Sequence, residues 1–290
     1  MGEPIEVTLT HPEKVLYPRD GITKQDIADY FDAVASAMIP TLRDRPLAFQ
    51  HWSQGTHRPP WFQQNIGNDA EPWMHLVETP TSTSKRLVRH LVADRPEALR
   101  WLAQHNALTL HMWSSREGSL ESPDWVVFDL DPGDGHGFEQ TLDVAFALRK
   151  WLEANDIPSV PKTSGKRGLH VFVPLAPGHT HDDAIAFAVN VGEELVHALP
   201  QTTMLRSKAQ RHGRLYFDCY QNGYGKTVVA PYTPREVDGA PVSAPLKWSE
   251  VTRKLDPMKF TVKTMPKRIE KVGDLFAAAL KGGIALKRFP

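Results

Sequence analysis

Two aspartates one residue apart, Asp129 and Asp131, follow an apolar run at residues 126–128, and Pro132 and Gly133 come directly after them. An uninterrupted apolar run is typical of a strand that is covered on both faces. Because side chains i and i+2 of a strand share a face, the two carboxylates would stand about 7 Å apart at their Cα atoms. In such a pair each carboxylate raises the pKa of the other, unless a cation lies between the two groups. Oxygen-only ligands suit Mg²⁺ or Mn²⁺, and carboxylate pairs that bridge two ions are typical of polymerases and nucleases.

Other interpretations of this pair depend on the neighbouring residues. Two solvated aspartates that cap a helix beginning at Phe138 are one alternative. An EF-hand loop that starts at Asp129 needs glycine at its sixth position and glutamate at its twelfth. Asp134 and Gln140 stand there, which excludes this loop. A phosphatase of the haloacid-dehalogenase kind has threonine or valine two residues after its second aspartate; Gly133 weakens this alternative without removing it.

A second motif, TSGKRGLHVFVPL at residues 163–175, places a glycine-bounded turn between two expected strands. Gly165 and Gly168 let the backbone approach a ligand closely. A turn of this kind can hold a triphosphate through backbone and side-chain donors. Taken alone it would be an ordinary hairpin, and it is no Walker A loop, but with the acidic pair upstream we interpret it as a phosphate site. The donors and positive charge come from Ser164, Lys166, Arg167 and His170.

A third motif covers residues 214–235, where two expected strands are joined by a glycine turn. Asp218 lies at the end of the first strand and could complete a metal site, although a strand-end aspartate in a turn is the alternative. Cys219 points to the opposite face and is interpreted as a small buried filler. Further polar residues of the motif are Gln221, Asn222, Lys226 and Arg235.

The elements that must position these residues alternate between helices and strands. Periodicity predicts helices at residues 23–42, 96–104, 138–154 and 182–199, and a basic helical tail from 245. Strands are expected at residues 108–112, 125–130, 159–163, 169–175, 215–220 and 227–232, with an extended segment at 46–52 and a loop at 58–62. This order favours an α+β fold with mixed or antiparallel sheets and flanking helices.

Composition sets further bounds on the class of protein. The chain has 290 residues, 41% of them hydrophobic and 23% charged, which suits one large domain or two intimate lobes. No apolar run approaches the ~18 residues of a membrane span, and no apolar signal segment is present, so a cytoplasmic, nucleoid-associated protein is expected. One cysteine excludes an internal disulfide and a cysteine-rich zinc site. Because the formal net charge is zero, local basic patches would have to hold a nucleic acid.

The motifs together resemble the archaeo-eukaryotic primase superfamily, and most closely the polymerase domain of bacterial ligase D, used in non-homologous end joining. The resemblance runs through almost the whole chain. Its segments are HPEKVLYP, ITKQDIADYF, PPWFQQN, LHMW, FDLDPGDG, TSGKRGLH and DCYQNGYGKTVVAPYTPR. The order and spacing of these segments are far more specific than any one of them.

The resemblance implies a role for each matching residue. Asp129, Asp131 and Asp218 match the metal-binding carboxylates. The nucleotide-binding set is Ser164, Gly165, Lys166, Arg167, His170, Lys226, Arg235 and, near the active site, His111. The DNA-binding set is Lys14 and Lys24 for a downstream 5′-phosphate, Phe62 beside Trp61 for stacking on the template, and Gln221 and Asn222.

Three departures from the family pattern qualify this assignment. The family usually has lysine where this chain has Arg167, which binds phosphate as a fork instead of a point charge. Ligase D polymerase domains often have Lys and Arg before the tryptophan at position 52, whereas this chain has Gln50 and His51, which puts selective 5′-phosphate recognition in doubt. The K-x-D-G motif of DNA ligases is absent, and the nearest match, EVDG at residues 236–239, lacks lysine.

The resemblance therefore implies a primase-polymerase fold with an RRM-like core, spanning residues 1–290 as a single domain. Its N-terminal lobe would cover about 1–120, its catalytic core 121–245 and its helical tail 246–290, with no ligase or nuclease domain. The implied activity is template-directed nucleotidyl transfer with two Mn²⁺ or Mg²⁺ ions, preferring ribonucleotides, at gaps or broken ends. The implied partners are DNA, NTP or dNTP, Ku and a separate ATP-dependent DNA ligase, and no membrane. A non-catalytic DNA-end-binding module using the basic residues at 206–214 and 259–271 is the main alternative, and an aspartyl phosphatase is the second.

Overall fold

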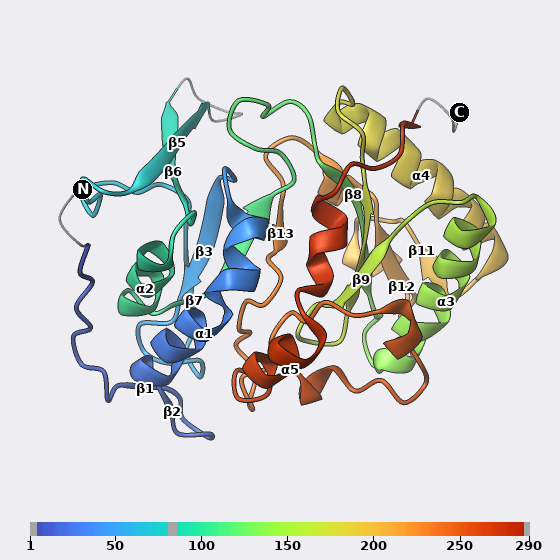
Figure 1. Ribbon diagram of the computed structural model, residues 1–290. Coiled ribbons are helices and arrows are strands. Elements are labelled where there is room, and N and C mark those ends of the chain that lie inside the picture. The colour runs from blue at the N-terminus through green and yellow to red at the C-terminus, as the bar shows by residue number, and fades with distance from the viewer. Residues whose placement is uncertain (1–4, 81–85, 287–290) are drawn as a thin grey trace. The chain divides into compact units, whose positions relative to one another are not determined.

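The structure, a computed structural model, describes residues 5–80 and 86–286 and contains two compact units (Figure 1). The first unit comprises residues 1–113, 227–243 and 258–274, and the second comprises residues 114–226, 244–257 and 275–290. The first boundary falls after Trp113, where a lobe boundary near 120 was expected. The segment from residue 246 onward does not form one tail, because its middle part packs with the first unit and its two flanks with the second. Within the described ranges, no helix has the length and apolar character needed to span a membrane.

The first unit is built on a four-stranded antiparallel sheet in the order β13-β7-β3-β4. Its strands are β3 (Leu47–His51), β4 (Trp61–Gln63), β7 (Ala107–Trp113) and β13 (Thr227–Val229). Two small antiparallel pairs accompany it: β1 (Val15–Tyr17) with β2 (Ile22–Thr23), and β5 (His75–Pro80) with β6 (Leu87–Val92). The helices are α1 (Lys24–Leu42), α2 (Pro96–Gln104) and α5 (Met265–Val272).

Helix α1 begins where the sequence predicted, at a capping box. Thr23 Oγ1 accepts a hydrogen bond from Asp26 N at 3.2 Å, and the Asp26 carboxylate accepts one from Thr23 N at 2.7 Å. These bonds satisfy two backbone donors that would otherwise lack partners at the start of the helix, and the carboxylate lies at the positive end of the helix dipole. The apolar face of α1, which includes Ile27, Phe31 and Val34, is fully buried, and α1 packs against α2.

The second unit is built on a five-stranded mixed sheet in the order β11-β12-β8-β10-β9. Its strands are β8 (Trp125–Asp131), β9 (Val160–Thr163), β10 (Leu169–Pro174), β11 (Thr202–Thr203) and β12 (Leu215–Asp218). All neighbouring pairs are antiparallel except β11 with β12. The helices are α3 (Phe138–Ala154) and α4 (His181–Ala198), with short 3-10 turns at η1 (Lys208–Gln210), η2 (Tyr220–Asn222), η3 (Trp248–Glu250) and η5 (Leu275–Leu280). This arrangement confirms the α+β prediction.

The two faces of this sheet have different coverings. Helices α3 and α4 lie on one face of the sheet (Figure 1). Phe128 points to this face, where its ring lies 6.2 Å from that of Phe187 on α4. Trp125 points to the opposite face, and there it contacts Phe276 of η5 with a ring separation of 5.9 Å. Asp129 and Asp131 share the face of Trp125, because side chains alternate along a strand. The acidic pair therefore stands on the same face as η5, at the other end of β8.

The structure corrects several element predictions. Residues 61 and 62, expected in a loop, belong to the edge strand β4, and the hairpin β5–β6 was not predicted. The strand expected at 215–220 ends at Asp218, because Tyr220 begins a 3-10 turn. Between residues 246 and 286, the described part of this segment, only α5 is an α-helix, and the remaining helical pieces are 3-10 turns, including η4 (Pro257–Lys259).

Candidate active site

Four polar side chains form one row across the sheet of the second unit. Strand pairing places Asp218 directly opposite Asp129, His170 opposite Asp129 on the other side, and Lys162 opposite His170. Directly opposite residues of antiparallel strands point to the same face. The row therefore runs Asp218, Asp129, His170, Lys162 over strands β12, β8, β10 and β9. His170 Nε2 lies 3.2 Å from Asp129 Oδ1, and Lys162 Nζ lies 2.8 Å from His170 Nδ1.

Asp131 stands beside this row, at the exposed end of β8 and opposite Tyr216. The charge of Asp129 and, secondarily, burial raise the pKa of Asp131 to about 7, while His170 and Arg211 act in the opposite direction. The Arg211 guanidinium lies over the Tyr216 ring at 3.6 Å. The repulsion expected from the D-x-D spacing is thus present, and a divalent cation would relieve it.

Asp218 is held in place by the turn that follows it. Its Oδ1 accepts a hydrogen bond from Tyr220 N at 2.9 Å. Burial and the charge of Asp129 raise the pKa of Asp218, while hydrogen bonds from Tyr216, Tyr220 and Gln221 lower it. Three aspartates of two neighbouring strands therefore lie on one face as an electrostatically coupled group.

The glycine-bounded turn at residues 164–168 connects β9 to β10 and comes alongside Asp131. Ser164 Oγ accepts hydrogen bonds from Gly168 N at 3.0 Å and from Lys166 N at 3.3 Å, which closes the turn. Gly165 adopts a φ of +76°, a conformation that favours glycine. A Cβ atom on Gly168 would lie 2.9 Å from Leu130 O and 3.0 Å from Asp131 Oδ1, so glycine permits this close approach.

The turn also carries the expected positive charge. Arg167 is exposed, and its Nη1 donates to His136 O at 3.1 Å. The Arg167 carbonyl accepts a hydrogen bond from Thr141 Oγ1 of α3 at 3.0 Å. The Arg167 guanidinium and the half-buried Lys166 side chain therefore extend from a turn that hydrogen bonds with His136 and Thr141 hold in place.

The donor chemistry of the three aspartates suits Mg²⁺ or Mn²⁺, because hard divalent cations prefer carboxylate oxygens. Among residues 5–80 and 86–286, no group of three or more acidic, histidine or cysteine side chains is already arranged around a common metal position. The elevated pKa values of Asp131 and Asp218 nevertheless mark these carboxylates as groups that a cation would stabilise. The residues fit the ions in charge and ligand type.

Two predicted residues of the second unit lie at the surface, and one is buried. Lys226 is exposed and Gln221 half-buried. Asn222 is fully buried, and its side chain bonds Val127 N at 2.7 Å and Val127 O at 2.9 Å. The DNA-contact prediction for Asn222 is therefore wrong, because its amide supports strand β8 from within the fold.

Among the predicted basic residues of the first unit, Lys24 has an unexpected environment. It is only 3% exposed, and its Nζ donates to Thr10 O at 2.7 Å and to Gln104 O at 3.0 Å. Burial and the neighbouring Lys14 lower the pKa of Lys24. Lys14 is half-buried, and Arg235 is mostly buried with its Nε 3.4 Å from Glu236. Lys24 can reach a phosphate only by leaving these carbonyl oxygens.

The two aromatic residues of β4 are both exposed, and because they are neighbours on one strand their rings point to opposite faces of the sheet. Trp61 and Phe62 are 51% and 50% exposed, which is unusual for large apolar side chains. The Trp61 ring stacks on that of His51 at 3.9 Å with an interplanar angle of 3°, and Phe62 contacts His111 edge-on at 5.8 Å. His51 is itself held by Gln63 Oε1 at 2.6 Å. Each exposed ring is thus supported by a histidine of a neighbouring strand, Trp61 by the buried His51 and Phe62 by the half-buried His111.

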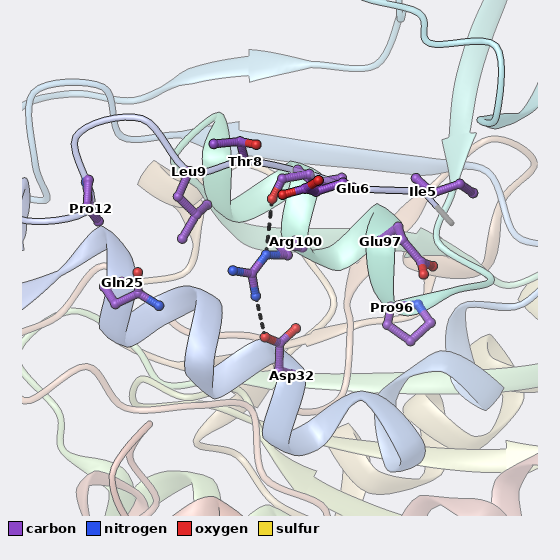
Figure 2. Close-up of a pocket in the computed structure, with 11 residues that line it drawn as sticks. Ile5, Glu6, Thr8, Leu9, Pro12, Gln25, Asp32, Pro96, Glu97 and Arg100 are labelled. Atoms are coloured by element: carbon purple, nitrogen blue, oxygen red, sulfur yellow. Dashed lines mark hydrogen bonds and ion pairs between the residues drawn. The ribbon is translucent and has the colours of Figure 1, made fainter. Parts of the chain in front are cut away.

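A pocket of about 460 Å³ also lies in the first unit (Figure 2). It is lined by the segment at residues 5–9 and by α1 and α2, and no predicted site residue is among its lining residues. Arg100 crosses it and pairs with Asp32 at 2.7 Å, while Glu6 and Glu97 add negative charge. Such a lining repels phosphates, so this pocket is not a nucleotide site.

Sequence reasoning missed two residues on the face that carries the three aspartates, Lys162 and Tyr216. The signal for Lys162 was available, because a lysine in the otherwise apolar strand VPKT must be buried or paired. Hairpin symmetry about the turn at 164–168 would then have placed Lys162 opposite His170. Tyr216 lacked such a signal, since its contact with Arg211 joins residues of a loop and a strand.

Comparison with known proteins agrees with this geometry. The model of the LigD primase-polymerase domain matches residues 23–276. The multifunctional non-homologous end joining protein LigD of Mycolicibacterium smegmatis is 33% identical over 276 residues, covering 93% of this chain and 36% of that protein. The bifunctional LigD of Bacillus subtilis is 29% identical over 270 residues, covering 92% of this chain and 43% of that protein. The chain thus spans between a third and a half of the length of these relatives.

A solved structure extends the agreement to the fold. The polymerase domain from Mycobacterium tuberculosis ligase D, in complex with DNA, superimposes with a TM-score of 0.88 at 32% identity. The alignment covers 96% of this chain and 99% of that one. The match therefore includes both units and not only the five-stranded sheet of the second unit. This chain belongs to the LigD primase-polymerase domain family.

Proposed function

We propose that this chain is a metal-dependent, template-directed nucleotidyltransferase that extends DNA ends or fills gaps during break repair. The observation that carries the proposal is the coupled group Asp129, Asp131 and Asp218 on one sheet face, with a donor-rich turn against Asp131. Family membership supports the same reaction. A phosphatase with Asp129 as nucleophile is less well supported. Asp129 would then lie on an acidic face that attracts protons, beside two further carboxylates, Asp131 and Asp218.

The aspartates would hold two divalent ions, Mn²⁺ or Mg²⁺. The chemistry that such ions supply when bound is activation of the primer 3′-hydroxyl and neutralisation of the triphosphate and its leaving pyrophosphate. Ser164 and the backbone of the turn would orient the triphosphate, and Lys166 and Arg167 would balance its charge. His170 would contact a phosphate oxygen from the floor of the site.

The exposed rings of Trp61 and Phe62 would each offer a surface on which template bases can stack, since stacking on aromatic rings tolerates any base. Lys14 would bind the phosphate of a downstream 5′ end, with Lys24 in a supporting role. Lys226, Arg235 and His111 would contact the nucleotide or primer, and Gln221 the DNA. We propose that ribonucleotides are preferred, because the family implies that preference.

We also propose that Ku and a separate ATP-dependent DNA ligase work with this chain in the cytoplasm, at the nucleoid. The relatives are named as non-homologous end joining proteins, which motivates this assignment. A non-catalytic end-binding module is the second candidate. It is favoured by the exposed basic residues Lys259, Lys263, Lys267 and Lys271, which would bind phosphates without chemistry.

The deciding experiment is primer extension on gapped DNA, with and without a 5′-phosphate. It compares rNTP with dNTP and Mn²⁺ with Mg²⁺, in wild type and in Asp129→Asn. We expect extension by wild type and a loss of at least 100-fold in the variant, as for removal of an essential electrostatic group. Asp134→Asn is the matched control, because Asp134 lies on the adjacent loop with a 70% exposed side chain. DNA binding without extension by wild type would instead favour the end-binding module.

A further inference from the structure

The exposed ring of Trp61, the first residue of β4, stacks on the buried ring of His51, the last residue of β3. The two residues are directly opposite each other in the antiparallel pair, so their side chains share one face of the four-stranded sheet. The ring centroids lie 3.9 Å apart and the ring planes differ by 3°. Because Trp61 is 51% exposed and His51 only 2%, the imidazole covers one side of the indole and leaves the other side open to solvent.

Three contacts fix the orientation of the His51 ring. Its Nδ1 lies 2.8 Å from His105 O, its Nε2 lies 2.6 Å from Gln63 Oε1, and the Phe49 ring meets it edge-on at 5.2 Å. Gln63 is held in turn, because its Nε2 donates a hydrogen bond to Asn65 O at 2.9 Å. A buried ring with a polar partner at each nitrogen is a rigid support for whatever stacks on it.

The Trp61 side chain depends on such a support. It belongs to a short edge strand, and Pro59 and Pro60 before it restrict the backbone without restricting the side-chain torsions of their neighbour. An exposed side chain exchanges between rotamers within nanoseconds unless a neighbour restrains it. Stacking on His51 supplies this restraint. An indole that is already ordered loses less conformational entropy when it binds a further ring.

We propose that His51 is a positioning residue that holds the Trp61 indole as a one-sided platform for a single nucleobase. The proposal rests on the proposed function, in which Trp61 stacks on a template base. The order of the stack is then nucleobase, Trp61, His51, and no second base can enter on the side that the imidazole covers. Phe62 cannot share this stack, because its side chain points to the opposite face of the sheet.

The first test observes the Trp61 ring directly, by fluorine NMR of the full chain labelled with fluorotryptophan. The chain has eight tryptophans, and Trp61→Phe identifies the Trp61 resonance among them. We expect this resonance in wild type to lie well away from its position in the urea-unfolded chain, because a stacked ring changes the local field. In His51→Ala it should move toward the unfolded position. In His51→Phe, which keeps a planar ring beneath the indole, it should stay separated from that position.

The second test measures the Kd for a primer-template with a single-stranded template overhang, by fluorescence anisotropy at constant salt. We expect His51→Ala to raise the Kd by roughly 3- to 10-fold, because an unrestrained side chain must be ordered on binding. His51→Phe should restore most of the affinity although it loses both polar contacts. In a Trp61→Ala background, His51→Ala should leave the Kd unchanged, because the two residues act as one unit.

The matched control is His90→Ala. His90 is also 2% exposed, and its ring nitrogens lie 2.9 Å from Thr79 Oγ1 and 3.0 Å from Leu47 O. Its ring contacts Trp113 edge-on and not Trp61. His90→Ala therefore removes a buried histidine of the same kind from the same unit, and it should leave the Trp61 resonance and the Kd as in wild type.

An unmoved Trp61 resonance in His51→Ala would overturn the proposal. An equal loss of affinity from His51→Ala with and without Trp61 would also overturn it, because His51 would then act through the stability of the fold. If His51→Ala does not fold, the wild-type spectrum decides, and a Trp61 resonance at its unfolded position refutes the stack. If Trp61→Ala leaves the Kd unchanged, the proposed template contact fails, and the resonances still show separately whether His51 fixes the ring.

Discussion

Replacing Asp131 by asparagine should stabilise the second unit in metal-free buffer and abolish nucleotide incorporation. Both effects follow from the negative charge of Asp131. In metal-free buffer this charge repels Asp129, and in the proposed reaction it would bind a divalent cation. The pKa of Asp131 is raised from 3.8 to about 7, first by the charge of Asp129 and then by burial. Asparagine keeps the size of the side chain and removes the charge, so the folded state no longer holds two repelling carboxylates.

The size of the effect follows from the strand geometry. Side chains i and i+2 lie about 7 Å apart, where two unit charges repel by about 0.6 kcal/mol at the dielectric constant of water and about 2.4 kcal/mol at an effective value of 20. Because Asp131 is exposed, water screens much of the repulsion, and we expect a stabilisation of about 1 kcal/mol. For a chain of this size that is a rise in Tm of roughly 2–4 °C.

The sign of the pH dependence follows from the raised pKa. Between pH 3.8 and about 7 the folded state keeps a proton on Asp131 that the unfolded state has lost. Wild-type stability therefore decreases as pH rises through this window and stays lower above it. The asparagine variant has no such proton. Its gain in stability over wild type should therefore be small near pH 3.8 and reach its full size above about pH 7.

The assay is thermal unfolding in EDTA, followed by circular dichroism on both sides of this window. Asp134→Asn is the control, because it removes an exposed aspartate that pairs with Lys208 at 3.3 Å and should give no stabilisation. Addition of Mn²⁺ should raise the Tm of wild type and leave that of Asp131→Asn nearly unchanged. A lower Tm for Asp131→Asn at high pH, or an equal rise at both pH values, would refute the repulsion argument.

Three further outcomes are expected. Asn222→Ala should lower the free energy of unfolding by about 2–4 kcal/mol in urea, because two buried Val127 backbone groups lose their partner; a change below ~0.5 kcal/mol would contradict this. Trp61→Ala should raise the Kd for primer-template by about 5- to 100-fold in fluorescence anisotropy at constant salt, the loss of one stacking platform, and an unchanged Kd would exclude that role. Gly168→Ala should raise the KM for nucleotide, because the new Cβ would displace Asp131 and Leu130; a wild-type KM would show that the turn can shift freely.

Much of the fold was readable from local patterns. Helix α3 was predicted with its observed bounds, and α1 to within one residue of its start, because apolar spacing acts within a few turns. The hairpin β5–β6 was missed, since its first strand, HLVETP, shows no clear alternation of apolar and polar residues in the sequence. Strand β4 was missed for a related reason: two exposed aromatic residues do not produce a period-2 burial pattern.

The candidate site shows the same division. The sequence by itself determined that Asp129 and Asp131 share a face, because strand periodicity depends on the backbone alone. It also indicated a glycine-bounded turn with positive charge. Only the tertiary structure decided that Asp218 and His170 flank Asp129, because the register between strands that are distant in the sequence is a non-local property. Burial, likewise decided only by packing, separated Asn222 and Lys24 from the exposed residues with which the sequence had grouped them.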